Sequence, residues 1–304
     1  FVRVLGQEPH WTLLREITEE MVKTLGSVVN DLGVETAGDA SGLSARCDHV
    51  GKRSRKNKAL PKPTGGKKEY TDEDGKVIRV IEWFGYKLHL VVDKRHEVVL
   101  AWSITAANVA DNEELPSVIE QAEENLPKGR IKSLAYDKAA DDEDIHELLE
   151  ESKIAAIIEN RSLWKDELER LLPGATGRSN IVYDESGTLY CYDKESDPPV
   201  RHRMAYIGHE PSRGTLKYRC PAMHQGWKCA SHERCNGSRK YGLTVRLKRE
   251  IDLRRFPAVP RATKKFERLY KGRTAVERVI GRLKVLWGAD DGNITGPERF
   301  HAYV

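Results

Sequence analysis

The sequence lacks long apolar runs and has few cysteines, and each shortage excludes a class of protein. It contains no stretch of about 18 or more apolar residues, which excludes a transmembrane helix. Five cysteines in 304 residues, four of them after Tyr190, do not form the dense framework of a small secreted domain. The chain begins FVRVLGQEPHW, without a Met or a basic-then-apolar leader. We therefore expect no signal peptide and a cytoplasmic protein.

The length and polarity of the chain limit its organisation. With 304 residues, 32% of them charged, and a mean hydropathy of −0.61, the chain can form one large domain, or one core with a sizeable insertion. No internal repeat is visible. Both ends look cut, the second at FHAYV, so we expect a fragment of a longer protein.

Charge occurs in blocks along the chain. Residues 52–68 hold eight basic residues and no acidic one, and basic residues recur every few positions over 239–284. Between these tracts, residues 141–151 hold seven acidic residues. A single charge block is ordinarily solvated surface. Two basic tracts on either side of an acidic one favour a polyanionic partner.

Apolar periodicity predicts the secondary structure. Residues 49–75 are basic and rich in turn formers, which predicts a mobile loop. The expected helices span residues 8–30, 112–125, 141–152 and 263–287, and the expected strands span residues 33–43, 77–92, 97–104, 131–136 and 154–158. The order of these elements is typical of an α/β domain with a mixed sheet.

The expected helix 263–287 carries two stripes of side chains. One is apolar and consists of Val276, Ile280, Leu283 and Trp287. The other is polar, with members within about 40° of one another around the helix axis, and consists of Tyr270, Arg273, Glu277 and Lys284. An ordinary surface helix with Arg–Glu pairing at i,i+4 spacing is an equally good interpretation of the polar stripe alone.

The spacing Tyr-x2-Arg-x3-Glu-x6-Lys in YKGRTAVERVIGRLK (270–284) resembles the signature of bacterial insertion-sequence transposases of the DDE type. The segment GYKLHLVVDKRHEVVLAWSITAANVADNEEL (85–115) is similar to their second and third strands, and AGDASGLS and LAYDKAADDEDI are similar to their two aspartate motifs. The resemblance covers residues 33–160 and 262–304. One departure is Ala139-Ala140-Asp141, where the family more often has Gly-Tyr-Asp.

The resemblance implies a ribonuclease H-like fold: a mixed sheet flanked by helices, with a β-rich insertion before the last helix. It implies a catalytic core at 33–165 and 262–304, an insertion subdomain at 166–261, and a truncated helical segment at 1–32.

The resemblance also implies the site. Asp39, Asp137 and Glu277 are the expected ligands of two Mg²⁺ ions, with Mn²⁺ as an alternative, since these cations prefer carboxylate oxygen. Tyr270, Arg273 and Lys284 are expected to contact DNA phosphates. The implied reaction is phosphodiester hydrolysis followed by strand transfer, on transposon ends and target DNA, by a homodimer in the DNA complex.

Other acids near the ends of expected strands compete for these roles: Asp93, Asp111, Asp141, Asp142 and Glu159. Asp111 fits the N-cap of a helix. Glu159 could be a fourth, outer acid.

A cysteine cluster lies within the expected insertion, as Cys220-x3-His224-x4-Cys229-x2-His232-x2-Cys235 with Cys191 upstream. Cys220, Cys229 and Cys235, together with Cys191 or a histidine, could make the four ligands of a structural zinc ion. The alternative is a set of free, partly buried cysteines.

Two other functions are compatible with these residues. One is a ribonuclease H-like nuclease that cuts DNA without joining it. The other is a domesticated DNA-binding protein that keeps the fold and has lost catalysis.

Overall fold

The computed structural model describes residues 2–46, 60–72, 76–165, 168–173, 180–291 and 296–304, and these form two compact units. The first unit comprises residues 1–140, 152–154 and 271–304, and the second comprises residues 141–151 and 155–270. This division places α4 (Glu143–Glu151) and β6 (Ala155–Ile158) in the second unit. The division into a core and an insertion that the sequence suggested stays a prediction.

The first unit holds five strands and five α-helices among its described residues. The strands are β1 (Glu35–Ser44), β2 (Thr64–Thr71), β3 (Val77–Asp93), β4 (Val99–Ala106) and β5 (Ser133–Tyr136). The helices are α1 (Val2–Leu5), α2 (His10–Val28), α3 (Asp111–Glu124), α8 (Thr274–Val285) and α9 (Pro297–Tyr303).

The long strand β3 organises the sheet of this unit. Its second half pairs antiparallel with β1 on one side and with β4 on the other, and its first half pairs with β2. Strand β1 pairs parallel with β5. The order is therefore β4-β3-β1-β5 with mixed strand directions. Buried β-branched and apolar residues fill the second half of β3, as expected for a strand covered on both faces.

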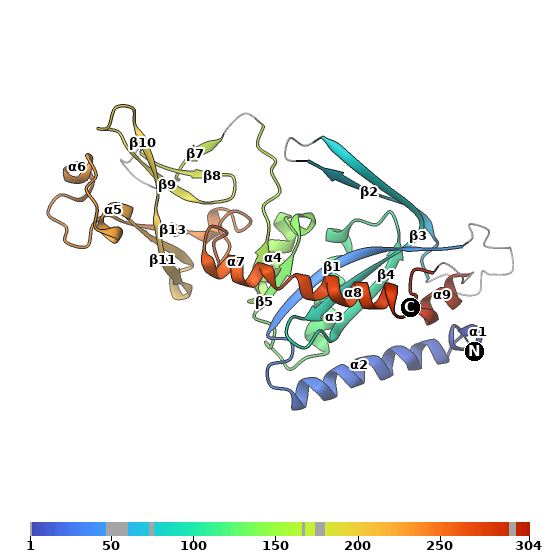
Figure 1. Ribbon diagram of the computed structural model, residues 1–304. Helices are drawn as coiled ribbons and strands as arrows, with labels where there is room; N and C mark the ends of the chain where they lie inside the picture. Colours follow the sequence, from blue (N-terminus) through green and yellow to red (C-terminus); the bar gives the residue numbers. More distant parts are fainter. Residues whose placement is uncertain (1, 47–59, 73–75, 166–167, 174–179, 292–295) are drawn as a thin grey trace. The chain divides into compact units, whose positions relative to one another are not determined.

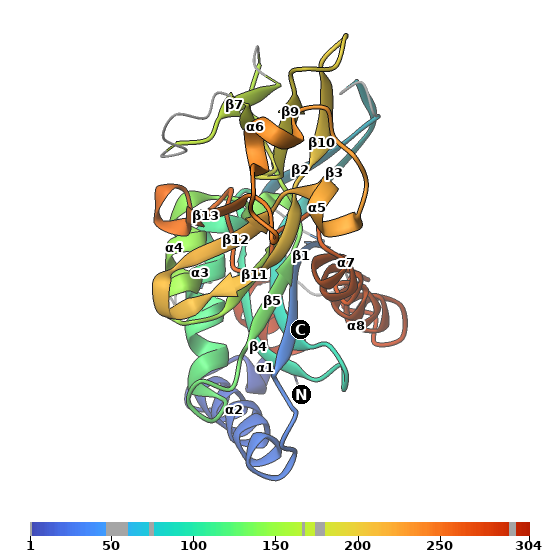
Figure 2. The same cartoon turned by 90° about the vertical axis from the view of Figure 1, so that its left-hand side faces the viewer.

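Helices cover both faces of this sheet. Figure 2 shows α3 and α8 on opposite sides of it. Helix α3 packs on β3 and β4 through an apolar stripe of Leu115, Val118, Ile119 and Ala122. Helix α8 packs along β1 and β3 through Ala275, Val276, Val279 and Ile280. The mixed α/β fold class predicted from the sequence is confirmed, and it is consistent with a ribonuclease H-like domain.

Two of the predicted elements need correction. The predicted loop 49–75 contains strand β2; residues 47–59 and 73–75 lie outside the described part of the chain. Strand β2 forms because it pairs in register along β3, a tertiary contact that its local composition does not reveal. The predicted helix 263–287 is two helices, α7 (Lys264–Lys271) and α8, which are separated at Gly272 and Arg273.

The apolar stripes of two helices are less buried than their spacing suggests. Helix α2 forms as predicted, yet Ile17, Met21 and Val28 are 56%, 61% and 75% exposed. At the end of α8, Trp287 is 75% exposed, so the buried stripe of that helix ends before it.

The second unit carries two small sheets. One has the order β10-β9-β8-β7 and the other the order β11-β12-β13. The strands are β7 (Glu169–Leu171), β8 (Ile181–Asp184), β9 (Leu189–Asp193), β10 (Val200–Arg203), β11 (Ala205–Glu210), β12 (Thr215–Arg219) and β13 (Thr244–Lys248). Figure 1 shows these strands in yellow-green to orange, with the short helices α5 (Pro221–Gln225) and α6 (His232–Asn236).

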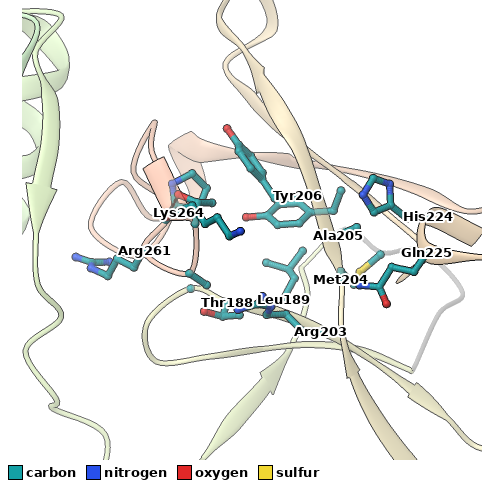
Figure 3. A pocket seen from close by; sticks show the side chains of 15 residues that line it. Thr188, Leu189, Arg203, Met204, Ala205, Tyr206, His224, Gln225, Arg261 and Lys264 are labelled. Atoms are coloured by element: carbon teal, nitrogen blue, oxygen red, sulfur yellow. Dashed lines mark hydrogen bonds between the residues drawn. The ribbon is translucent and has the colours of Figure 1, made fainter. Parts of the chain in front are cut away.

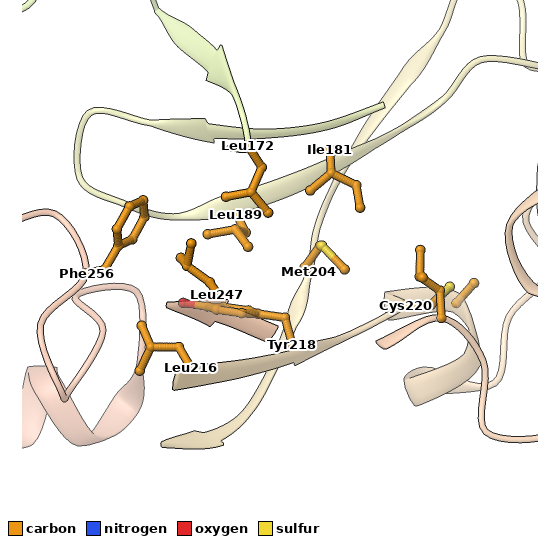
Figure 4. Packing of buried hydrophobic residues seen from close by; sticks show 11 residues of the cluster. Leu172, Ile181, Leu189, Met204, Leu216, Tyr218, Cys220, Leu247 and Phe256 are labelled. Carbon is orange, nitrogen blue, oxygen red and sulfur yellow. The ribbon is translucent and has the colours of Figure 1, made fainter. Parts of the chain in front are cut away.

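The two small sheets of the second unit share a hydrophobic core. Ile181 and Leu189 from one sheet meet Leu216 and Leu247 from the other, and all four are fully or almost fully buried. Figure 4 shows this cluster, with Cys220 at its edge. The described residues between β6 and α7 form seven short strands, which fit the β-rich insertion expected before the last helix.

Candidate active site

Two of the three predicted acids lie side by side, one on β1 and the other directly after the end of β5. In the parallel pair of β1 and β5, Thr36 faces Leu134 and Ala37 faces Ala135. Asp39 lies two residues beyond Ala37 on β1, and Asp137 lies two residues beyond Ala135, directly after the end of β5, so an extension of the same register brings them level with each other. The charge of Asp137 acts on Asp39, as expected for neighbouring carboxylates.

The environment of Asp39 is unusual for a carboxylate. Burial and the neighbouring charge of Asp137 raise the pKa of Asp39 to about 6, although the Ala40 N–H and the charges of Arg273 and Lys68 act in the opposite direction. The side chain of Asp39 is only 14% exposed. A like charge close to a buried acid is the arrangement that a bound cation relieves.

Arg273 joins Asp39 to the third predicted acid. Its guanidinium lies 3.6 Å from Asp39 Oδ2 and 2.5 Å from Glu277 Oε1. The two contacts come from the N-terminal end of α8, which packs along β1. The structure thus connects Asp39, Arg273 and Glu277 in a chain of ion pairs, with the Glu277 side chain 45% exposed.

Lys284 anchors the other end of α8 on the same strand. Its ammonium donates hydrogen bonds to the Gly42 carbonyl at 2.5 Å and to Asp290 Oδ2 at 3.2 Å. Asp290 also accepts a bond from the Ser44 N–H at 2.7 Å. Helix α8 therefore presents Arg273 and Lys284 to β1 at two points, on the side of the sheet that carries Asp39.

Tyr270 does not continue the polar stripe of α8. It belongs to α7, in the second unit, where its ring stacks on Phe266 with centroids 5.8 Å apart. The helix is interrupted beyond it at Gly272, whose missing side chain leaves room for Lys94; a Cβ there would lie 1.9 Å from Lys94 Cε. Because of this interruption, Tyr270 and Glu277 do not belong to one continuous helix, and their spacing does not place them on a common face.

Most competing acids have structural partners. Asp93 is 1% exposed and accepts bonds from three backbone N–H groups, those of Gly33, Arg95 and His96. Asp111 begins α3 and pairs with Lys87 at 2.9 Å; the N-cap position itself is Ala110.

Asp141 is the centre of a buried ionic network in the second unit. Burial raises its pKa, but the hydrogen bond from His146 and the charges of Arg261 and Arg254 outweigh that effect and hold the pKa below its usual value. The nitrogen–oxygen distances to Arg254 and Arg261 are 2.7 and 2.9 Å. Nearby, Asp142 accepts the Asp144 N–H at 3.2 Å, and Glu159 is exposed.

Two of the three predicted acids are placed to bind a hard divalent cation, and the third is not. Asp39 and Asp137 supply adjacent carboxylate oxygens, and burial, followed by the charge of Asp137, raises the pKa of Asp39. Glu277, however, is engaged by Arg273. Over the described part of the chain, no group of three or more His, Cys, Asp or Glu side chains is arranged to hold a metal ion.

The four cysteines of the expected zinc site are neighbours, but zinc finds no support in their arrangement. Burial, followed by the proximity of Cys220, Cys229 and Cys235, raises the pKa of Cys191 to about 12. Cys229 donates its S–H to Asp193 at 3.3 Å, and burial and this bond raise its pKa to about 11. All four are free thiols, and zinc at these residues stays a prediction.

A basic pocket of about 430 Å³ opens in the second unit (Figure 3). Figure 3 shows Tyr206 and Met204 among its apolar wall residues and Arg203 and Lys264 among its cations. The Tyr218 hydroxyl, also in its lining, is buried without a hydrogen-bond partner among the described residues. The pocket contains no predicted catalytic acid.

Comparison with protein families identifies the chain. A family model described as "Transposase DDE domain" matches residues 58–304, which is more than half of the sequence. The chain belongs to this transposase family. No curated protein matches it. Membership in a DDE transposase family supports transposase activity in general and implies DNA binding.

The family match bears unequally on the three acids. Asp137 and Glu277 fall within residues 58–304, whereas Asp39 precedes that range. The case for Asp39 therefore depends on its register beside Asp137 and its ion pair with Arg273.

Among the described residues, no helix combines the length and the apolar character needed to span a membrane.

Three features of the site were not foreseen from the sequence. The first is the ion pair between Arg273 and Asp39, the second is Asp290, which holds Lys284 and the end of β1, and the third is Lys68, which acts electrostatically on Asp39. Only Lys68 had a sequence signal, as the last residue of the basic tract at 52–68.

Proposed function

We propose that this member of the DDE transposase family cuts DNA strands at the ends of an insertion sequence and joins them to target DNA. Asp39, Asp137 and Glu277 are the proposed catalytic acids. The observation that carries the proposal is the placement of Asp39 on β1 beside Asp137 at the end of β5, with Arg273 bridging Asp39 to Glu277.

In this proposal Asp39 and Asp137 would hold a divalent cation, Mg²⁺ or Mn²⁺, and Glu277 would join them after leaving Arg273. Metal ions bound there would activate a water molecule as nucleophile and stabilise the leaving 3′ oxygen of the phosphodiester. A second role of the same acids, with a DNA 3′-OH as nucleophile, would give strand transfer.

The cations of the chain have complementary tasks. Arg273 offsets the charges of Asp39 and Glu277, the two acids that it bridges. If Glu277 turns away, the guanidinium could donate to phosphate oxygens in its place. Lys284 lies along the same strand and could neutralise the next phosphate. Tyr270 is the third proposed phosphate contact. Homodimer formation on DNA is part of the same proposal.

The test is the substitution Glu277→Gln in the full-length protein. Duplexes carrying the inverted repeats that border its reading frame are labelled and incubated with Mg²⁺. We expect binding to be retained and cleavage to fall by about 10³-fold or more, since metal ions contribute several kcal/mol to such reactions. Glu124→Gln, which removes an exposed acid on α3, is the control and should cleave normally.

The same assay separates the alternatives. A pre-cut end that is joined to a target plasmid indicates a transposase, and cleavage without joining indicates a nuclease. A protein that binds the ends and never cleaves them in Mg²⁺ or Mn²⁺ indicates a DNA-binding protein without catalysis. Unchanged cleavage by Glu277→Gln would remove Glu277 from the site.

A further inference from the structure

A two-stranded ribbon projects from the sheet of the first unit. Strand β2 pairs with the first half of β3 from Thr64 opposite Gly85 to Tyr70 opposite Arg79. Figure 1 shows β2 and this half of β3 extending beyond the other strands of their sheet. All four residues from Val77 to Val80 are exposed, so both faces of the ribbon are open near its end.

The two faces of the ribbon differ in charge. On one face lie Lys68, Tyr70 and Arg79, with the Lys68 ammonium 5.8 Å and the Arg79 guanidinium 6.0 Å from the centre of the Tyr70 ring. Within the described residues no carboxylate forms an ion pair with Lys68 or Arg79. We call these three residues the basic face. Because side chains alternate along a strand, the adjacent Lys67 lies on the other face.

The other face carries more negative than positive charge. Lys67 lies opposite Glu82 in the register and pairs with Glu69 at 2.6 Å. An anionic partner is therefore attracted to the basic face and is repelled by the other, where two carboxylates outnumber one cation. This asymmetry cannot be read from the composition of the two strands taken together.

The ribbon is fixed to the strand that carries Asp39. The Trp83 ring lies against Gly42 of β1 and Gly66 of β2, where a Cβ would come within 2.4 and 2.5 Å of it, and its Nε1 donates to the Tyr86 carbonyl at 3.1 Å. Gly42 is also the residue that accepts from Lys284. Lys68 lies near enough to Asp39 for its positive charge to act on that carboxylate.

We infer that the β2–β3 ribbon is a DNA-binding arm whose basic face contacts the phosphate backbone of the duplex beside the cleavage site. The inference depends on the proposed function, since it takes DNA as the polymer bound at Asp39. A two-stranded ribbon has the width that the major groove admits, and cations with an aromatic side chain between them suit a phosphate track. The exposed Ile78 and Val80 lie on the face opposite the basic one, since they alternate with Arg79 along β3, and need not contact DNA.

Paired substitutions on the two faces test this arm. Lys68→Ala combined with Arg79→Ala removes two cations from the basic face, and Lys67→Ala removes one cation from the other face. Affinity for the labelled inverted-repeat duplex is measured by fluorescence anisotropy at several salt concentrations, with Ca²⁺ in place of Mg²⁺. We expect the double variant to bind about tenfold more weakly, with a salt slope smaller by about 2, and Lys67→Ala to bind within about twofold of the unsubstituted protein.

The outcomes are distinguishable from those of the cleavage test. The binding measurement is repeated in the Glu277→Gln background, so a failed assignment of Glu277 leaves the ribbon result intact. Equal effects on the two faces, or unchanged affinity of the double variant, would overturn the DNA-binding arm. A change in oligomeric state without DNA, seen by sedimentation velocity with affinity unchanged, would instead make the ribbon a contact between copies of this chain.

Discussion

Asp39 shows how the fold changes the chemistry of one residue. In the unfolded chain its carboxyl has the ordinary aspartate pKa of 3.8, whereas burial and Asp137 raise it to about 6 in the folded chain. The folded state therefore binds this proton more tightly than the unfolded state. Stability contributed by the protonated form is present at low pH and is lost as the pH rises from about 4 to about 6.

Asp39→Asn is expected to stabilise the protein without divalent cations. The variant removes the buried charge, so at pH 7 its free energy of unfolding should exceed that of the unsubstituted protein by on the order of 2–3 kcal/mol, and the gain should shrink toward pH 4. Denaturant unfolding in EDTA at several pH values measures this, with Glu124→Gln as control. A variant that is less stable at pH 7 would show that the ion pair with Arg273 outweighs burial.

At the scale of the element, the contact between the ribbon and β1 depends on glycine. Gly66 is buried against Trp83, and a Cβ there would lie 2.5 Å from the ring and 2.9 Å from Ala107 Cβ. Its neighbour Gly65 faces the other way and has no atom within 4 Å of the Cβ position. A rigid indole cannot yield as a flexible chain end would, so the two adjacent glycines should differ sharply in tolerance.

Gly66→Ala should cost about 1–3 kcal/mol of stability through overpacking, and Gly65→Ala should change it by less than about 0.5 kcal/mol. Thermal unfolding followed by circular dichroism compares the two, and Trp83 fluorescence reports whether the ring moves. If both substitutions are equally tolerated, Trp83 is not held between β1 and β2 as described.

At the scale of the whole molecule, the two compact units have separate sources of stability. The first is centred on its mixed sheet, and the second contains the buried network of Asp141 with His146, Arg254 and Arg261. Each arginine side chain is below a tenth exposed, so neither can replace Asp141 with water. Loss of the shared carboxylate leaves two buried cations without their main partner.

Asp141→Asn should therefore destabilise the second unit by about 3–5 kcal/mol. Hydrogen exchange followed by mass spectrometry should show faster exchange in β8, β9 and β12, with the strands β1 and β3 much less affected. Asp144→Asn, at an exposed neighbouring acid, serves as the comparison. Uniform loss of protection in both units would mean that they unfold together.

The sequence alone determined much of the first unit. Apolar spacing was enough for α3, β3, β4 and β5, since each element buries one regular stripe or a continuous run, and the Tyr-Arg-Glu-Lys spacing pointed to the transposase family that the family match supports. Local composition did not predict the elements whose form depends on residues distant in the chain. Strand β2 looked like a loop because its stability comes from pairing with β3, and one long helix was expected where Gly272 makes room for Lys94.

Only the tertiary structure decided how the candidate acids relate to one another. Asp39 has no local signal beyond its small neighbours, and its place beside Asp137 follows from the parallel register of β1 and β5 across almost 100 residues of chain. The ion pairs of Arg273 likewise depend on α8 packing against β1. Charges and hydrogen bonds act over a few ångströms in space, and sequence spacing reports such distances only within a single helix or strand.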